Sequence, residues 1–300
     1  MGLASAAAAV VVWGASAVLL KQVEGLNGLG IAYYRVWLGA VLVSLVFVVQ
    51  GGRITRRLLR LSLLGGLAFL TDLVLFFSAV QETSVANATV IGALQPVLVL
   101  GVSNRLFGER ARVPEVVWGA VAIGGAVLVV AGGDAGGANS LHGDLLAVGA
   151  LVAWTLYFVA SKTARQALTA LEYLTGMAIV AAVGVLPLPL LFPGSLGTTD
   201  ADGWITIVYI TVINGLLGHF LMSWAHGHVT LLGVSLLTLG IPVVSAAAAW
   251  VWIDEPLVAL QVLGMGVVIT ALGLVSVSAA RHRPVAAAAD LAAAEAVPNP

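Results

Sequence analysis

Apolar residues along the chain fall into ten long runs separated by short polar stretches. The runs lie near 4–20, 29–50, 61–80, 84–106, 114–132, 143–161, 171–192, 204–224, 229–253 and 257–280. A helix needs roughly 20 apolar residues to cross the hydrocarbon core of a bilayer. The apolar–polar alternation of barrel strands is missing from the sequence, and Ala, Leu and Val dominate the runs. The pattern predicts an all-α integral membrane protein with ten transmembrane helices.

Composition narrows the function classes. The chain of 300 residues is 60% hydrophobic and 9% charged, whereas soluble domains carry about 25% charged residues. Its net charge of −1 gives no reason to expect a nucleic-acid partner. It contains no cysteine, which excludes disulfides, thiol catalysis and thiolate metal sites. Ten spans leave only short loops, so a soluble catalytic domain is not expected.

The basic residues gather in alternate loops. With ten spans, eleven of the thirteen fall on one side: Arg53, Arg56, Arg57, Arg60, Arg105, Arg110, Arg112, Lys162, Arg165, Arg281 and Arg283. The opposite loops carry mainly acids: Glu24, Glu82, Asp134, Asp144, Asp200, Asp202, Asp254 and Glu255. Lys and Arg are retained in cytoplasmic loops. Both termini are therefore predicted to be cytoplasmic.

Two segments of the chain share one sequence pattern. "VVWGASAVLLK" contains Trp13 and Lys21, and "VAWTLYFVASK" contains Trp154 and Lys162 at the same spacing, 141 residues later. The two segments could instead resemble each other only because alanine-rich helices have similar compositions. A second pair of matched positions argues against it.

That second pair is a proline followed by an acid. Pro96 precedes Glu109 by thirteen residues in the fourth window, and Pro242 precedes Glu255 by thirteen in the ninth. Two halves of five helices each would explain both pairs. Because five is odd, the second half must insert upside down, and the charges after the fourth and ninth windows are opposite. Inverted repeats are typical of secondary transporters.

The predicted organisation has four parts. A first five-helix repeat covers residues 1–133, a Gly-rich extracytoplasmic linker 134–142, and a second repeat 143–280. The segment 281–300 is biased in composition and predicts a disordered cytoplasmic tail.

These residues also resemble a known family. The stretches "FFSAV" and "NATVIGALQPVLVLGVSNRLFGER", the echo of the latter in the second half, and "YYRVW" in the second window are similar to the EamA family of the drug/metabolite transporter superfamily. The resemblance covers residues 4–280. It implies a ten-helix exporter of small metabolites, with the fifth and tenth helices beside a central cavity; some relatives export amino acids, including aromatic ones. The second half departs from the family pattern, because "WIDEP" stands there in place of the "GE" that ends the matching stretch of the first half.

Two ionisable residues at membrane depth are the leading site candidates. Asp72 lies within the third window, and His219 in the eighth follows Gly218, the position equivalent to Asp72. Because charge at this depth is costly, such residues are functional candidates by default. Asp72 could bind an ammonium group or a proton, with His219 sharing that role. The alternatives for Asp72 are a hydrogen bond to a neighbouring helix or a position nearer the outer interface.

Further substrate-binding candidates are polar or aromatic: Asn87, Asn214, Ser235, Thr238, Trp13, Trp154 and Tyr157, with Gln95 as an additional polar residue. The polar residues could equally serve helix packing, and the aromatic ones could anchor helix ends at the interface. Pro96 and Pro242 are candidates for hinges or gates, since proline breaks the helical hydrogen-bond ladder.

Other charged residues have simpler explanations. Arg35 could pair with a substrate carboxylate or extend to the interface. Lys21 and Lys162 read as anchors at helix ends. His226 and His228 are two residues apart without a nearby acid, so no metal site is expected there.

The sequence therefore predicts a secondary transporter, not an enzyme. It would export small metabolites, with amino acids and aromatic ones among them as expected substrates, by alternating access across the cytoplasmic membrane. The expected partners are a small-molecule substrate, the lipid bilayer and, through Asp72, a proton; no cofactor and no metal are expected. A homodimer stays open, because neither the fifth nor the tenth window contains G-x-x-x-G. The alternatives are an intramembrane enzyme, a non-transport membrane protein, or a carrier of a cationic drug or another metabolite.

Overall fold

The computed structural model describes residues 1–19, 23–83, 85–133, 140–252, 254 and 256–295. Side chains of residues 17, 18, 80, 81, 85–87 and 278–295 are also outside the description. Lys21, Glu255, residues 134–139 of the expected linker and the side chain of Asn87 thus lie outside the described part of the chain.

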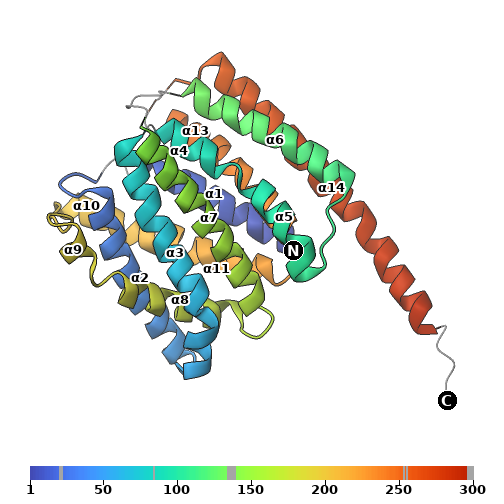
Figure 1. The fold of residues 1–300 in the computed structure, drawn as a ribbon, viewed down its shortest axis with the longest axis horizontal. Coiled ribbons are helices and arrows are strands. Elements are labelled where there is room, and N and C mark those ends of the chain that lie inside the picture. Colours follow the sequence, from blue (N-terminus) through green and yellow to red (C-terminus); the bar gives the residue numbers. More distant parts are fainter. Residues whose placement is uncertain (20–22, 84, 134–139, 253, 255, 296–300) are drawn as a thin grey trace.

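The described residues form helices and no strands (Figure 1). The first half contains α1 (Gly2–Leu19), α2 (Gly28–Val49), α3 (Arg56–Glu82), α4 (Val85–Gly92), α5 (Gln95–Phe107) and α6 (Val113–Gly132). The second half contains α7 (Leu141–Ala164), α8 (Ala170–Gly184), α9 (Leu188–Leu191), α10 (Ala201–Ile210), the π-helix η2 (Thr211–Gly218), α11 (His219–His226), α12 (Leu231–Leu237), the 3₁₀ turn η3 (Thr238–Gly240), α13 (Ile241–Trp252) and α14 (Ala259–Glu295).

Nine helical stretches of the described chain are long and apolar enough to cross a membrane. They coincide with nine of the ten predicted windows, and the chain is an all-α, multi-pass membrane protein. The first window corresponds to α1, which is apolar over the shorter stretch Gly2–Ser16.

The fourth and ninth windows are each broken in mid-span. The first break separates α4 from α5, and Pro96 is the second residue of α5. The other is the turn η3 between α12 and α13, and Pro242 is the second residue of α13. Proline lacks an N–H and fits the first turn of a helix, where that N–H would have no helical partner. Each proline therefore starts a new helical segment after a break.

Packing joins the two halves of the chain. In the second half, α7 packs against α3, α4 and α5 of the first half. In the first half, α1 packs against η2, α11, α12 and α13 of the second. The first helix of each half therefore contacts mainly helices of the other half.

Helices α6 and α14 pack chiefly against each other and run side by side along one edge of the bundle (Figure 1). Gly125 and Gly264 permit this close approach, because a Cβ on Gly264 would lie 2.7 Å from the Gly125 carbonyl oxygen. The backbone of α14 continues to Glu295, into the segment predicted to be a disordered tail. The high helix propensity of its alanines favours that conformation; the disorder stays a prediction.

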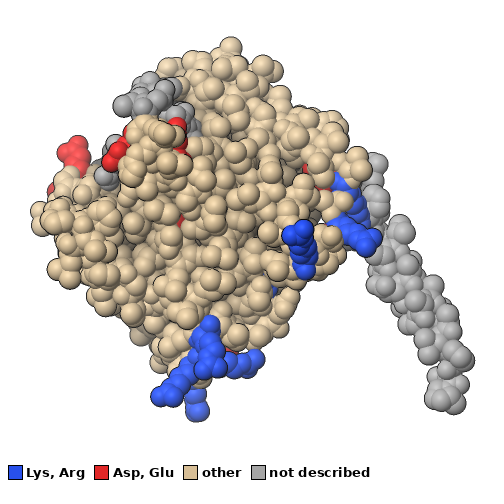
Figure 2. Space-filling view, in the orientation of Figure 1, with Lys and Arg blue, Asp and Glu red and all other residues tan. Residues whose placement is uncertain are grey.

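Charge separates along the bundle. Figure 2 shows Lys and Arg side chains at the lower and right-hand side and Asp and Glu side chains mainly at the upper left. We call these the basic end and the acidic end. Helix α3 runs from the basic end, at Arg56, to the acidic end, at Glu82.

Candidate functional site

A cavity of about 260 Å³ lies where the broken helices meet α3 and α7. We call it the Asp72 cavity. Its lining residues come from α3, α4 and the break after it, α7, η3 and α13: Asp72, Phe76, Ala88, Thr89, Gly92, Ala93, Ala147, Ala150, Leu151, Trp154, Thr238, Leu239, Ile241 and Pro242. It thus brings together four predicted site residues from both halves, namely Asp72, Trp154, Thr238 and Pro242.

The cavity lies in the acidic half of the bundle. Asp72 is seven residues before Ala79, the end of its apolar span, which is about 10 Å at 1.5 Å per residue. Gly92 and Ala93 line the cavity where α4 stops. A helix break leaves backbone carbonyls and N–H groups without intrahelical partners. Such broken ends commonly surround the ligand in membrane transporters.

An aromatic cluster forms one wall. Trp154 stacks on Tyr157 with ring centroids 5.0 Å apart, and Trp13 meets Trp154 edge-on at 5.5 Å. His219 lies behind them, 5.0 Å from Trp13, and shares a 2.9 Å hydrogen bond between Nδ1 and the Tyr157 hydroxyl. Trp13 and Tyr157 are buried and do not line the Asp72 cavity. Trp154 therefore presents this cluster to the cavity.

His219 belongs to a second, smaller space. It lines a cavity of about 40 Å³ together with Arg35, Phe69 and Gly215. Arg35 contacts the eighth span: its Nη2 donates a 2.8 Å hydrogen bond to Oδ1 of Asn214. Asp72 and His219, expected at equivalent heights, thus line separate cavities, and the side-chain oxygen of Asn214 is already occupied.

The π-helix η2 explains part of this geometry. It widens one turn of the eighth span, and π-bulges often occur at functional sites. The Asn214 carbonyl in η2 accepts a 3.1 Å hydrogen bond from Trp13 Nε1. Gly218 ends η2, and a Cβ there would overlap the Trp13 indole. Glycine at this position therefore lets Trp13 pack against the helix backbone.

Three polar residues join the two broken helices below the cavity. Ser235 donates to Oε1 of Gln95 at 3.0 Å. The Thr238 hydroxyl donates to the Ser235 carbonyl at 2.6 Å, and its oxygen lies 3.4 Å from the same Gln95 oxygen. Ser235 is buried in this packing contact, whereas Thr238 also lines the cavity. Pro96 is buried in the core, while Pro242 lines the cavity.

His226 and His228 each contact a neighbouring side chain. Nδ1 of His226 is 2.8 Å from Oγ of Ser161, and His228 stacks on Trp224. The contact between Ser161 and His226 links α7 to α11 at the basic end.

The fold and the cavity define a multi-pass helical membrane protein with a small amphipathic chamber between two halves. The family model of the EamA-like transporter family matches residues 1–131 and 141–277. The chain belongs to this family, whose members are transporters and not enzymes.

Two further comparisons agree with this. Over 177 residues the chain is 29% identical to the aromatic amino acid exporter YddG of Ancylobacter novellus, a match that covers 57% of this chain and 59% of that protein's length. A solved crystal structure superposes with a TM-score of 0.80 at 20% identity, covering 94% of this chain and 98% of the other. At 20% identity, the match to the crystal structure shows a shared fold and nothing about function.

Proposed function

We propose that this protein exports small amphipathic metabolites, with aromatic amino acids as the first candidates, by alternating access. The observation that carries the proposal is the Asp72 cavity, where an acid, an indole and two broken helices meet at membrane depth. The name of the relative, an aromatic amino acid exporter, supports the substrate class.

The size and chemistry of the cavity suit such a cargo. Its volume of about 260 Å³ is just below the range of roughly 300–1,000 Å³ typical of small-molecule sites. Asp72 would pair with an ammonium group, and the face of Trp154 would hold an aromatic ring or a cation. Most of the remaining lining is aliphatic.

Arg35 favours a carboxylate-bearing cargo over a purely cationic one. Within the described chain its guanidinium contacts the Asn214 amide and no carboxylate. The space beside it, about 40 Å³, is large enough for about three waters, since one water needs roughly 10–15 Å³. In the proposed cargo-bound state the two cavities would join, and the cargo carboxylate would replace such waters and provide a counter-ion for a charge that is costly at this depth. A cationic drug without a carboxylate lacks this match.

The mechanism that we propose uses ten helices arranged as two inverted repeats. It is supported by the matched breaks near Pro96 and Pro242 and by the exchange of α1 and α7 between the halves. The two prolines would act as hinges. Both termini would be cytoplasmic, because the basic end carries most of the positive charge, and the membrane would be the plasma membrane.

The direct test of function is counterflow in liposomes preloaded with unlabelled tryptophan, phenylalanine or a mixed amino-acid pool. We expect accumulation of the labelled amino acid, abolished by Asp72→Ala and retained by Asp200→Ala, a change at the acidic end that removes only a helix cap. If none of the amino acids accumulates while a cationic dye does, the substrate class would be wrong although the protein is a transporter.

A second experiment concerns the driving force, which is either the substrate gradient alone or proton antiport through Asp72. An imposed pH gradient should accelerate wild-type flux and have no effect on Asp72→Asn. If the wild type ignores the gradient, or if Asp72→Asn still responds to it, Asp72 does not couple transport to protons.

A further inference from the structure

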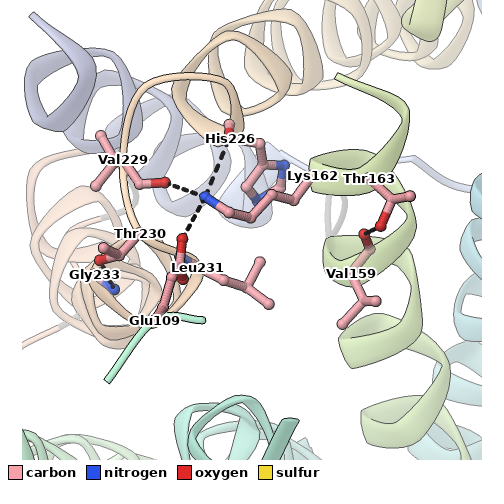
Figure 3. Close-up of polar contacts among 9 residues, drawn as sticks. All are labelled: Glu109, Val159, Lys162, Thr163, His226, Val229, Thr230, Leu231 and Gly233. Atoms are coloured by element: carbon pink, nitrogen blue, oxygen red, sulfur yellow. Dashed lines mark hydrogen bonds and ion pairs between the residues drawn. The ribbon is translucent and has the colours of Figure 1, made fainter. Parts of the chain in front are cut away.

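An ion pair with a full set of partners lies at the basic end (Figure 3). Nζ of Lys162 lies 2.8 Å from Oε1 of Glu109 and donates to the carbonyls of Val229 at 2.6 Å and His226 at 3.5 Å. Oε2 of Glu109 accepts a 2.7 Å hydrogen bond from the Leu231 N–H. All three ammonium hydrogens and both carboxylate oxygens therefore have partners.

Local structure fixes both charged residues. Gly108 caps α5 with φ 66°, a left-handed conformation that glycine adopts without strain, and turns the chain at Glu109. Lys162 lies in the last turn of α7, where the helix dipole favours a cation. Its Nζ also sits 5.6 Å from the centre of the Phe107 ring.

The pair is largely withdrawn from solvent. The side chains of Lys162 and Glu109 keep 13% and 16% of their exposed area. An ion pair at this depth offsets its desolvation cost when its remaining hydrogen-bonding groups are satisfied, as here, and removing one partner is strongly destabilising. The contacts join the end of α5, from the first half, to α7 and to the α11–α12 loop of the second half.

The pair and the Asp72 cavity lie at opposite ends of the same helices. On α7, Lys162 is eight residues beyond Trp154, about 12 Å along the axis. On the ninth span, Leu231 is seven residues before Thr238. Buried side chains fill the space between the two ends, among them Val99 and Phe158, both 0% exposed. A cavity of about 200 Å³ at the basic end is lined by Glu109 and shares no lining residue with the Asp72 cavity, so the two are separate in this structure.

We propose that Glu109 and Lys162 form a clamp that closes the basic end of the transport path, and that the clamp opens when cargo enters from that end. The proposal rests on the proposed function, since it assigns a step of the transport cycle to these two residues. Closure of the basic end by a bond between the halves would leave the opposite end free to release cargo.

The test uses the absence of cysteine in the chain, which makes any introduced thiol unique. Val99→Cys places a thiol behind the clamp, and an impermeant maleimide is added on the basic-end side of sealed vesicles. In the Glu109→Gln background we expect labelling at least about tenfold faster than in the otherwise unchanged protein. The matched control is Glu115→Gln. Glu115 is an acid six residues away, and among the described residues its carboxylate accepts from the Arg112 N–H at the start of its own helix and from no other group. Equal labelling rates in the Glu109→Gln and Glu115→Gln backgrounds would overturn the proposal.

Lys162→Met is a second variant that removes the ion pair. The labelling rate is read from whichever of Glu109→Gln and Lys162→Met elutes from gel filtration as a single monodisperse species. As an independent measurement, Glu109→Cys with Lys162→Cys is joined by a short bifunctional thiol reagent that reduction can cleave. Counterflow should stop on cross-linking and return on reduction, and counterflow that continues in the cross-linked protein would contradict the clamp. The labelling test needs no cargo. Failure of amino-acid counterflow would therefore refute the proposed substrate class and leave the clamp standing.

Discussion

Replacing Gly218 by alanine should destabilise the protein through one contact between its two halves. Gly218 ends η2 directly beside the indole of Trp13. An added Cβ would overlap Nε1 and lie 2.8 Å from Cδ1 of that indole, closer than real Cβ atoms come to other atoms. Trp13 is 7% exposed and is enclosed by Trp154 and His219, so its ring cannot move aside freely.

The expected cost has two parts. Overpacking a filled core typically costs about 1–3 kcal/mol. Displacing the indole also breaks the bond from Trp13 Nε1 to the Asn214 carbonyl, which contributes about 0.5–1.5 kcal/mol. The free energy of unfolding should therefore fall by roughly 2–4 kcal/mol.

The assay is unfolding by SDS in mixed micelles, with Gly124→Ala as the control. Gly124 is also a helical glycine, but no atom lies within 4 Å of an added Cβ, so this variant should lose no stability. In a Trp13→Leu background the Gly218→Ala change should cost less than about 1 kcal/mol, because the two changes share one contact. A loss below about 0.5 kcal/mol, the range of ordinary surface substitutions, would refute the predicted close approach of Trp13 and Gly218.

Four further predictions address transport. Arg35, which borders the smaller cavity, is expected to contact the cargo carboxylate. Arg35→Gln should therefore lower the counterflow rate of tryptophan about tenfold or more and leave unchanged the rate of tryptamine, which lacks the carboxylate. Equal losses for both compounds would contradict this contact. Trp154→Ala should raise the half-saturating concentration of an aromatic cargo about tenfold, which corresponds to the loss of a stacking contact of about 1.4 kcal/mol. The control is Trp204→Ala, which replaces a partly exposed tryptophan outside the cavity and should leave that concentration unchanged. Pro242→Ala should lower the maximal counterflow rate without changing equilibrium binding of cargo, since its position after η3 makes it a hinge; a change in binding alone would make it a wall residue. Single cysteines at Arg57 and at Asp202 should react with impermeant reagents from opposite faces of sealed cells, Arg57→Cys from the cytoplasm, and labelling of both from one face would contradict the orientation.

The helical architecture could be predicted because hydrophobicity is the property that a bilayer selects most directly. Nine of the ten apolar windows coincide with helical spans. The breaks near Pro96 and Pro242 could also be anticipated, because the missing N–H and fixed φ of proline act within one turn of the chain. Trp154 and Asp72 meet at one cavity, as their residue types suggested.

Contacts that depend on how helices rotate against one another could not be obtained in the same way. From the sequence, Ser235 and Asn214 could either bind a substrate or serve helix packing; in the structure the first is paired with Gln95 and the second with Arg35. The π-helix shifts the faces of the eighth span, so alignment of Asp72 with Gly218 could not show that His219 turns toward a different cavity.

Two features of the sequence, taken together, would have pointed to the ion pair between Glu109 and Lys162. Each residue closes a repeated spacing, and with ten spans both fall on the basic side. Opposite charges at the same end of two packed helices are candidates for pairing. Interpreting Lys162 as an interfacial anchor, on its own, missed this contact.

The central claim is that the Asp72 cavity holds the cargo and opens toward the acidic end, and a single thiol in its wall tests this most directly. Ala150→Cys lies in the lining contributed by α7. We expect an impermeant maleimide added at the acidic end to modify this cysteine, and excess tryptophan to slow the reaction at least about fivefold. A thiol that is modified at the same rate with and without tryptophan, or only from the basic end, would contradict it.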